Sequence, residues 1–280
     1  MIRLIAMDLD GTLLDSRWQV PAVNRKAIAR AIDSGVHVAV VTGRRFAFAQ
    51  PITEQLDPRV ALIANNGALI TTPRGETLLR HLLPREVARR VLEATTAFRA
   101  HAAVVFDRKG PGQIVYERID WADPMRRSYF ERNRPYLAES CPLEASLVED
   151  PLQVMYTGPV APMRRLVAQL SELPFAGDFA VAMAEYEQRD FTIVDVIERT
   201  CSKGNALRDW AARLGVGREE ILAIGDNLND RDMLAFAGQA VVMDNAVPEL
   251  KTLGWPVTLS NDDGGVAVAI ERYVFADRES

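Results

Sequence analysis

Three short runs of acidic and small residues each follow an apolar segment, and their side chains could bind a phosphate group and a cation. The runs are Asp8-Leu9-Asp10-Gly11-Thr12, Thr42-Gly43-Arg44 and Gly225-Asp226-Asn227-Leu228-Asn229-Asp230. Their glycines allow the backbone to approach a ligand closely, and carboxylates are oxygen ligands for hard cations. One such run could be an ordinary turn with a capping Asp or Thr, but three together indicate a binding site.

The carboxylates of Asp8, Asp10 and Asp226 would repel one another if the runs met. Two unit charges about 4 Å apart interact by about 4 kcal/mol at an effective dielectric near 20, so the cluster requires a proton or a bridging cation. Oxygen ligands without a nearby His or Cys favour Mg²⁺. Lys203, which opens a predicted helix after the N-cap Ser202, could neutralise the cluster and hold an anionic substrate.

The apolar segments that precede these runs are typical of buried parallel strands. We expect strands at residues 3–7, 36–41, 60–64, 221–224 and 240–243. Between these strands, apolar residues recur at helical spacing and predict helices. Two of these helices are predicted to end at Gly35 and Gly215. This order predicts an α/β domain, whose ligands bind at the carboxyl ends of the strands. The three polar runs stand at those ends.

The middle of the chain has a different pattern and predicts a mixed α+β insert. Its first element is a helix on which Val87 and Phe98 share a face. Strands are expected at residues 104–106, 114–116, 152–157, 179–184 and 191–197. The predicted domains are therefore residues 1–82 with 195–280, and an inserted domain at 83–194.

Composition limits the classes of partner. The chain has 280 residues, of which 48% are apolar and 25% charged, and its net charge is −5. It can bury a full core, and it has no electrostatic reason to bind nucleic acid or anionic lipid. There is no apolar run of the roughly 18 residues that a membrane span needs. The apolar N-terminus meets Asp8 without a basic region, so we expect no signal peptide and a cytoplasmic protein.

The cysteines and histidines are assigned no chemistry. Cys141 and Cys201 lie outside any CxxC pattern, which indicates a reducing compartment, and both are expected to be buried as small hydrophobic residues. The histidines are scattered along the chain, and no metal or base role follows for any of them; they are His37, His81 and His101.

Four motifs resemble, in their order, those of the haloacid dehalogenase superfamily. They are Asp8-Leu9-Asp10-Gly11-Thr12, Val41-Thr42-Gly43-Arg44, Lys203 and the run from Gly225 to Asp230. The insert resembles the type-IIB cap of the Cof-like phosphatases in length and placement. Further Cof-like features are Asn65-Asn66-Gly67-Ala68, Met243-Asp244-Asn245-Ala246 and the run from Asn261 to Val266. The resemblance implies a Rossmann-like parallel sheet with helices on both faces and an inserted α+β cap.

The resemblance also implies catalytic roles. Asp8 would be the nucleophile that forms an aspartyl-phosphate. Asp10 would protonate the leaving oxygen and then activate the attacking water. Mg²⁺ would be held by Asp8, Asp226 and the backbone carbonyl of Asp10. Thr42 and Lys203 would grip the phosphoryl oxygens.

Other residues would bind the phosphate or support those that do. The resemblance implies phosphate contacts from the backbone of Leu9 and Gly43 and the side chain of Asn229. Arg44 and Asn66 could face the substrate, although Arg44 could equally lie on the surface and Asn66 could fill a turn with positive φ. Asp230 is expected to orient Lys203 or a metal-bound water, or to cap the next helix.

The expected function is a Mg²⁺-dependent phosphatase acting on a small phosphorylated metabolite, such as a sugar phosphate or a phosphorylated cofactor. A phosphomutase of the phosphomannomutase type would use the same aspartyl-phosphate with a bisphosphate primer. A phosphoryl-binding module resembling a receiver domain is the alternative outside enzymes. We expect neither nucleic acid nor membrane as a partner, and both monomer and homodimer remain open.

Overall fold

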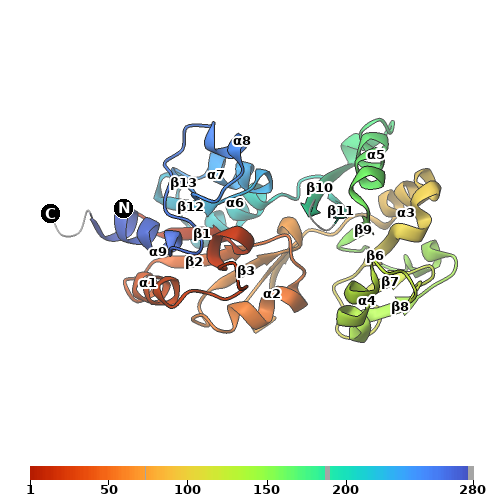
Figure 1. Cartoon of the computed structure of the whole chain (residues 1–280), viewed down its shortest axis with the longest axis horizontal. Helices are drawn as coiled ribbons and strands as arrows, with labels where there is room; N and C mark the ends of the chain where they lie inside the picture. Colours follow the sequence, from red (N-terminus) through yellow and green to blue (C-terminus); the bar gives the residue numbers. More distant parts are fainter. Residues whose placement is uncertain (73, 187–189, 277–280) are drawn as a thin grey trace. The chain divides into compact units, whose positions relative to one another are not determined.

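The computed structural model describes residues 1–72, 74–186 and 190–276, and it divides into two compact units (Figure 1). The discontinuous unit contains Met1–Arg80 and Ser202–Ser280, and the inserted unit contains His81–Cys201. The inserted unit thus begins two residues before the boundary expected from the sequence and ends seven residues after it. The later end arises because the last strand of the inserted unit continues to Glu198.

A seven-stranded sheet forms the centre of the discontinuous unit. Its strands, in spatial order, are β13 (Gln239–Val242), β12 (Ile221–Gly225), β1 (Leu4–Asp8), β2 (His37–Val41), β3 (Ala61–Ala64), β4 (Leu69–Thr71) and β5 (Thr77–Arg80). The five strands from β13 to β3 are parallel, as the apolar runs predict. The short strands β4 and β5 add an antiparallel edge that the sequence analysis missed.

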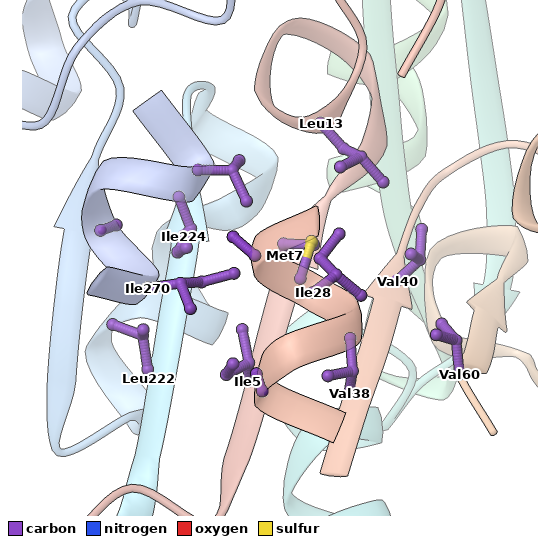
Figure 2. Close-up of a cluster of buried hydrophobic side chains, with 14 of the residues drawn as sticks. Ile5, Met7, Leu13, Ile28, Val38, Val40, Val60, Leu222, Ile224 and Ile270 are labelled. Carbon is purple, nitrogen blue, oxygen red and sulfur yellow. The ribbon is translucent and has the colours of Figure 1, made fainter. Parts of the chain in front are cut away.

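Helices cover both faces of this sheet, and successive residues of each strand alternate between the two layers. Ile5 and Met7 of β1 pack with α1 and α9 on one face (Figure 2). Leu4 and Ala6 pack on the opposite face with α6, α7 and α8. The helices are α1 (Ala22–Asp33), α2 (Phe46–Thr53), α6 (Lys203–Leu214), α7 (Arg231–Phe236), α8 (Pro248–Lys251) and α9 (Gly265–Ile270). Because both faces are covered, the central strands are apolar along most of their length.

The predicted start and end of α6 are confirmed, and α1 ends two residues before the predicted Gly35. The hydroxyl of Ser202 accepts a hydrogen bond from the backbone N–H of Asn205 at 3.1 Å, which caps α6. Gly215 ends α6 in the left-handed conformation. Helix α1 ends at Asp33, and Gly35 lies just beyond its cap with a φ of +88°.

The inserted unit is a six-stranded sheet with helices on both faces. Its strands, in spatial order, are β10 (Phe179–Tyr186), β11 (Phe191–Glu198), β9 (Gln153–Gly158), β6 (Ala102–Val105), β7 (Ile114–Tyr116) and β8 (Leu137–Glu139). All pairs are antiparallel except β7 with β8. Helices α3 (Arg85–Ala94) and α5 (Val160–Ser171) pack on one face, and α4 (Arg127–Asn133) packs on the other.

Two expectations for this unit are wrong. Helix α3 ends at Ala94 and does not reach Phe98, which lies in a following 3-10 turn at Thr96–His101. Cys141 is exposed, whereas Cys201 is buried as expected. Strand β8 was not predicted, because its residues, Leu-Ala-Glu, are half-buried or exposed and do not form an apolar run like that of β7. Among the described residues, no helix is long and apolar enough to cross a membrane.

Candidate active site

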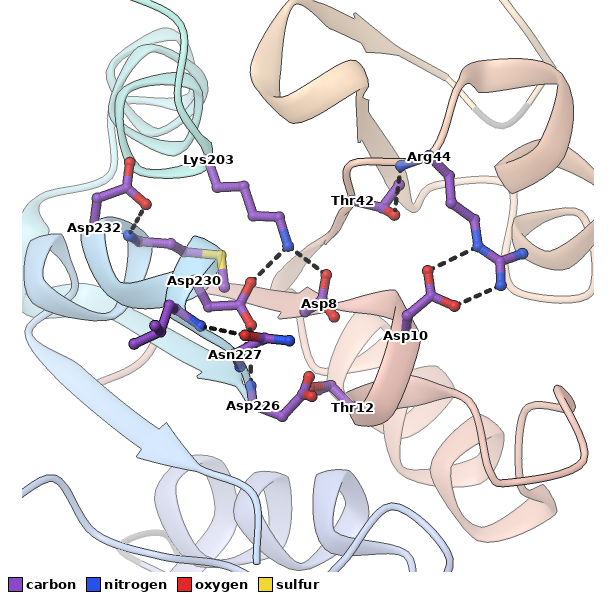
Figure 3. A network of polar contacts seen from close by, with 12 residues as sticks. Asp8, Asp10, Thr12, Thr42, Arg44, Lys203, Asp226, Asn227, Asp230 and Asp232 are labelled. Atoms are coloured by element: carbon purple, nitrogen blue, oxygen red, sulfur yellow. Dashed lines mark hydrogen bonds and ion pairs between the residues drawn. The ribbon is translucent and has the colours of Figure 1, made fainter. Parts of the chain in front are cut away.

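The three polar runs meet at one edge of the parallel sheet. Asp8 is the last residue of β1, which lies between β2 and β12. Thr42 follows β2, and Asp226 follows β12. Since the three strands run parallel, their carboxyl ends coincide, and the side chains that follow them gather there as the sequence predicts (Figure 3).

A tight turn at Leu9–Leu13 brings the first run against Asp226. Gly11 has a φ of +80°, and a Cβ placed on it would lie 2.3 Å from Oδ2 of Asp226. Both the backbone conformation and the close approach therefore require glycine. Thr12 donates a hydrogen bond from its hydroxyl to Oδ1 of Asp226 at 2.7 Å. This contact fixes the orientation of the Asp226 carboxylate.

Lys203 connects two carboxylates in the interior. It is the first residue of α6, and its ammonium group donates to Oδ1 of Asp8 and to Oδ1 of Asp230, each at 2.6 Å. The lysine is 2% exposed and Asp230 is fully buried. A buried lysine is stable only with such partners, so the ammonium group is an integral part of the cluster.

Asp230 binds Lys203, as one interpretation of the sequence expected, but its side chain does not cap the next helix, α7. Its Oδ1 accepts from Lys203, and its Oδ2 accepts the backbone N–H groups of Asp226 and Asn227, each at 3.0 Å. It therefore orients the lysine and also caps the turn that carries Asp226. Asn229 lies exposed in the same turn, at Leu228–Asp230.

Burial and repulsion change the acidity of the cluster. Burial raises the pKa of Asp8 well above its usual range, and the charge of Asp230 adds to this, while Lys203 opposes it. Burial and Asp230 likewise raise the pKa of Asp226 to about 7. The pKa of Lys203 is raised, because its two carboxylate partners outweigh the effect of burial.

The donor set fits a hard divalent cation. Asp8, Asp226 and Asp230 each offer a carboxylate oxygen, and these oxygens lie within 4.8 Å of one another. Burial, and then repulsion from neighbouring carboxylates, raises the pKa values of Asp8 and Asp226, and a bound cation would relieve that repulsion. All the donors are oxygens, as Mg²⁺ prefers.

Asp10 is held apart from this cluster by Arg44. The guanidinium donates from Nε to Oδ2 of Asp10 at 2.7 Å and from its terminal nitrogen to Oδ1 at 2.5 Å. Figure 3 shows the Asp10 carboxylate facing Arg44, while Lys203 faces Asp8. The guanidinium carbon also lies 5.1 Å from the ring centroid of Trp18. The sequence indicates roles for Asp10 and Arg44 separately, but their spacing does not predict this pairing.

The remaining residues of the second run lie beside Asn66. Thr42 is buried, and its hydroxyl accepts the backbone N–H of Arg44 at 3.1 Å. Asn66 has a φ of +54° and donates its backbone N–H to the carbonyl of Thr42 at 3.2 Å. Its Oδ1 lies 2.8 Å from where a Cβ on Gly43 would stand. The side chain of Leu9 is buried in the core, so only its backbone is available to a ligand.

Asn245 supports the site but was given no role from the sequence. Its side-chain amide donates to the carbonyl of Gly11 at 2.7 Å and accepts the backbone N–H of Asn261 at 2.9 Å. Asn261 in turn donates to the carbonyl of Leu14 at 2.8 Å. The two Cof-like features that contain Asn245 and Asn261 thus fasten the turn that presents Gly11 to Asp226.

Comparison with known proteins identifies the family. The sequence profile of the haloacid dehalogenase-like hydrolases matches residues 5–270. The HMP-PP phosphatase of Serratia proteamaculans is 31% identical, over 90% of this chain and 88% of its own length. The 5-amino-6-(5-phospho-D-ribitylamino)uracil phosphatase YwtE of Bacillus subtilis is 26% identical, over 97% of this chain and 98% of its own.

A solved structure agrees with this assignment. A haloacid dehalogenase-like hydrolase from Bacteroides thetaiotaomicron superposes with a TM-score of 0.79 at 25% identity, over 97% of this chain and 99% of its own. The chain belongs to the haloacid dehalogenase-like hydrolases. Within that family it is a phosphatase, a hydrolase of phosphoric monoesters.

Proposed function

We propose that the discontinuous unit is a Mg²⁺-dependent catalytic core that hydrolyses a phosphate monoester through an aspartyl-phosphate on Asp8. The observation that carries this proposal is the position of Asp8. It ends the central strand β1, it is buried, and its Oδ1 accepts from Lys203 at 2.6 Å. A carboxylate oriented in this way can present its other oxygen to an electrophile.

The reaction has two displacements. In the first, an oxygen of Asp8 attacks phosphorus, the bond from phosphorus to the leaving oxygen breaks, and Asp10 gives that oxygen a proton. In the second, Asp10 removes a proton from a water molecule that attacks phosphorus, and the bond to Asp8 breaks. Free phosphate and the original Asp8 carboxylate result. Asp10 must turn from Arg44 toward the leaving oxygen to perform these steps, since both its oxygens bind Arg44 in the structure.

The cation would be held by Asp8, Asp226 and the backbone carbonyl of Asp10. Both carboxylate oxygens of Asp230 already accept from Lys203 and from backbone N–H groups, so we assign Asp230 a supporting position. When bound, Mg²⁺ orients the phosphoryl group and screens its charge from the nucleophile. Thr42, Lys203, Asn229 and the backbone of Leu9 and Gly43 would hold the phosphoryl oxygens.

The substrate would be a small phosphorylated metabolite, either a sugar phosphate or a phosphorylated cofactor. Two relatives support this class, because their names specify HMP-PP and a phosphoribitylamino uracil. We propose that the inserted unit acts as a cap that selects the leaving group. Arg44 and Asn66 are candidates for substrate contacts on the core. A small-molecule partner also agrees with the net charge of −5.

The test is phosphate release from a panel of sugar phosphates, nucleotides, phosphorylated cofactors and an aryl phosphate, with and without Mg²⁺. Asp8→Asn removes the nucleophile with little change in shape, and we expect it to lose about 10⁴-fold or more in turnover. Full activity in Asp8→Asn would contradict the assignment of the nucleophile. Isomerisation that depends on a bisphosphate primer, with little free phosphate, would favour the phosphomutase instead.

A further inference from the structure

A second cluster of metal-ligating side chains lies within the inserted unit. Its residues come from the first and last segments of that unit. His81 is the first residue of the unit, Cys201 is the last, and Glu198 ends β11. Each offers one ligand atom, and the three atoms lie within 4.8 Å of one another. None of these residues takes part in the acidic site of the other unit. We propose that His81, Glu198 and Cys201 bind a zinc-class transition-metal ion.

The three ligand types select against the cation proposed for the acidic site. A thiolate and an imidazole are soft and borderline ligands that suit Zn²⁺, whereas Mg²⁺ prefers oxygen alone. Tetrahedral Zn²⁺ with bonds of roughly 2.0–2.3 Å places its ligand atoms about 3.3–3.6 Å apart. The observed atoms lie within 4.8 Å of one another, so small side-chain shifts would bring them to that spacing. Three protein ligands leave a fourth position for water.

The local backbone holds Glu198 and Cys201 on one short turn. The N–H of Cys201 donates to the carbonyl of Glu198 at 2.9 Å. The N–H of Thr200 donates to Oε2 of Glu198 at 2.8 Å, and the Thr200 hydroxyl donates to the same oxygen. A carboxylate has several lone pairs, so these bonds orient Glu198 while leaving it able to coordinate a cation.

Burial also suits a bound ion. Cys201 is 5% exposed, and His81 and Glu198 are half-buried. A buried thiol is inert as a nucleophile in apolar surroundings, but a metal ion deprotonates it outright. The half-buried imidazole and carboxylate leave a route by which an ion can reach the thiol.

Such an ion would cross-link residues that are distant in sequence. His81 and Cys201 are separated by 120 positions, the difference between their numbers. Joining them removes conformational freedom from the unfolded chain, and this effect grows with loop length. The bound ion would therefore stabilise the inserted unit as a whole.

The first test is a Co²⁺ titration of the full chain, stripped of metal and kept reduced, with excess Mg²⁺ to fill the acidic site. We expect one equivalent of Co²⁺ to produce a thiolate-to-cobalt charge-transfer absorption. Cys201→Ser should abolish it, and the matched control Cys141→Ser should retain it. His81→Ala and Glu198→Gln should each weaken Zn²⁺ binding by about 100-fold or more. A missing absorption, or one that survives in Cys201→Ser, would overturn the proposal.

A second measurement needs no variant. Zn²⁺ should slow alkylation of Cys201 in the unaltered protein by at least about tenfold and leave Cys141, which is exposed, unaffected. Equal rates at Cys201 with and without Zn²⁺ would also refute the site. Both readouts are independent of catalysis, so they stand or fall separately from the proposed phosphatase mechanism. Mg²⁺-dependent phosphate release should be unchanged in Cys201→Ser.

Discussion

Protonation of Asp226 governs when the acidic cluster can accept a cation. Burial and the neighbouring charge of Asp230 raise the pKa of Asp226 to about 7, so a proton competes with Mg²⁺ below that pH. We expect Mg²⁺ affinity to rise by up to about tenfold per pH unit between about pH 5 and pH 7, as Asp226 loses its proton. Calorimetric titration across this range measures it. Asp226→Asn should bind weakly with a shallower pH dependence, and an unchanged slope in that variant would contradict the assignment.

The pair formed by Asp10 and Arg44 can be tested with a double-mutant cycle. If Arg44 acts by positioning Asp10, Arg44→Ala should lower kcat by about 10–100-fold, and Asp10→Asn by about 10²–10⁴-fold. The double variant should then be no slower than Asp10→Asn alone, because the contact is already lost. If Arg44 instead contacts the substrate directly, Arg44→Ala should raise KM. The losses caused by Arg44→Ala and Asp10→Asn should then multiply in the double variant.

At the scale of elements, the turn at Leu9–Leu13 depends on Gly11. Gly11→Ala would force a Cβ to within 2.3 Å of Oδ2 of Asp226 at a φ of +80°, so we expect phosphate release to fall by about 100-fold or more and stability to fall by about 1–3 kcal/mol. Gly35→Ala is the matched control. Gly35 has a φ of +88° with nothing within 4 Å of its added Cβ, so only backbone strain should appear, and activity should persist. Equal losses in both variants would show that strain alone matters.

The helices and strands differ in how well they can be predicted from their residues. The parallel strands could be predicted because both their faces are buried, which makes most of β1 and β2 apolar. Strands β4 and β8 have three residues each, too few to show a period of two. Strand β7 is equally short and was predicted because it is a run of large apolar residues beside a turn-rich segment. The end of α3 was placed too late because Phe98 still packs on the same core after the helix has ended.

The acidic site was predictable as a set of loops at one sheet edge, but its pairings were not. Lys203 and Asp8 are separated by 195 positions, and the packing of α6 on the face of the sheet that contains β1 brings them together. The bond between Arg44 and Asp10 depends on side-chain direction, which spacing does not reveal. The cluster of His81, Glu198 and Cys201 has no motif in the sequence, since its ligands meet only where the inserted unit closes on itself.

For the whole molecule, the raised pKa values of the buried carboxyl groups predict how stability depends on pH. A carboxyl group whose pKa is higher in the folded chain stabilises it at low pH, and that stabilisation is lost as the pH rises through the folded value. The metal-free protein should therefore lose stability between about pH 4 and pH 7, because burial raises the pKa of Asp226 to about 7. Thermal unfolding at a series of pH values measures this. Added Mg²⁺ should restore the lost stability at neutral pH. Asp226→Asn should make stability depend less on pH. An equally steep dependence in that variant would mean that groups other than Asp226 cause the effect.

The discontinuous unit also sets the order in which a newly made chain can fold. Leu4 of β1 pairs with Ile221 of β12. During synthesis, the edge of β1 that pairs with β12 therefore has no partner strand until more than two hundred further residues have been made. The inserted unit, His81–Cys201, is continuous in the chain and leaves the ribosome whole before β12 appears. Asp8 therefore meets Lys203 and Asp226 only after the inserted unit has been made, and a chain truncated before residue 203 would carry the proposed nucleophile without the lysine that orients it.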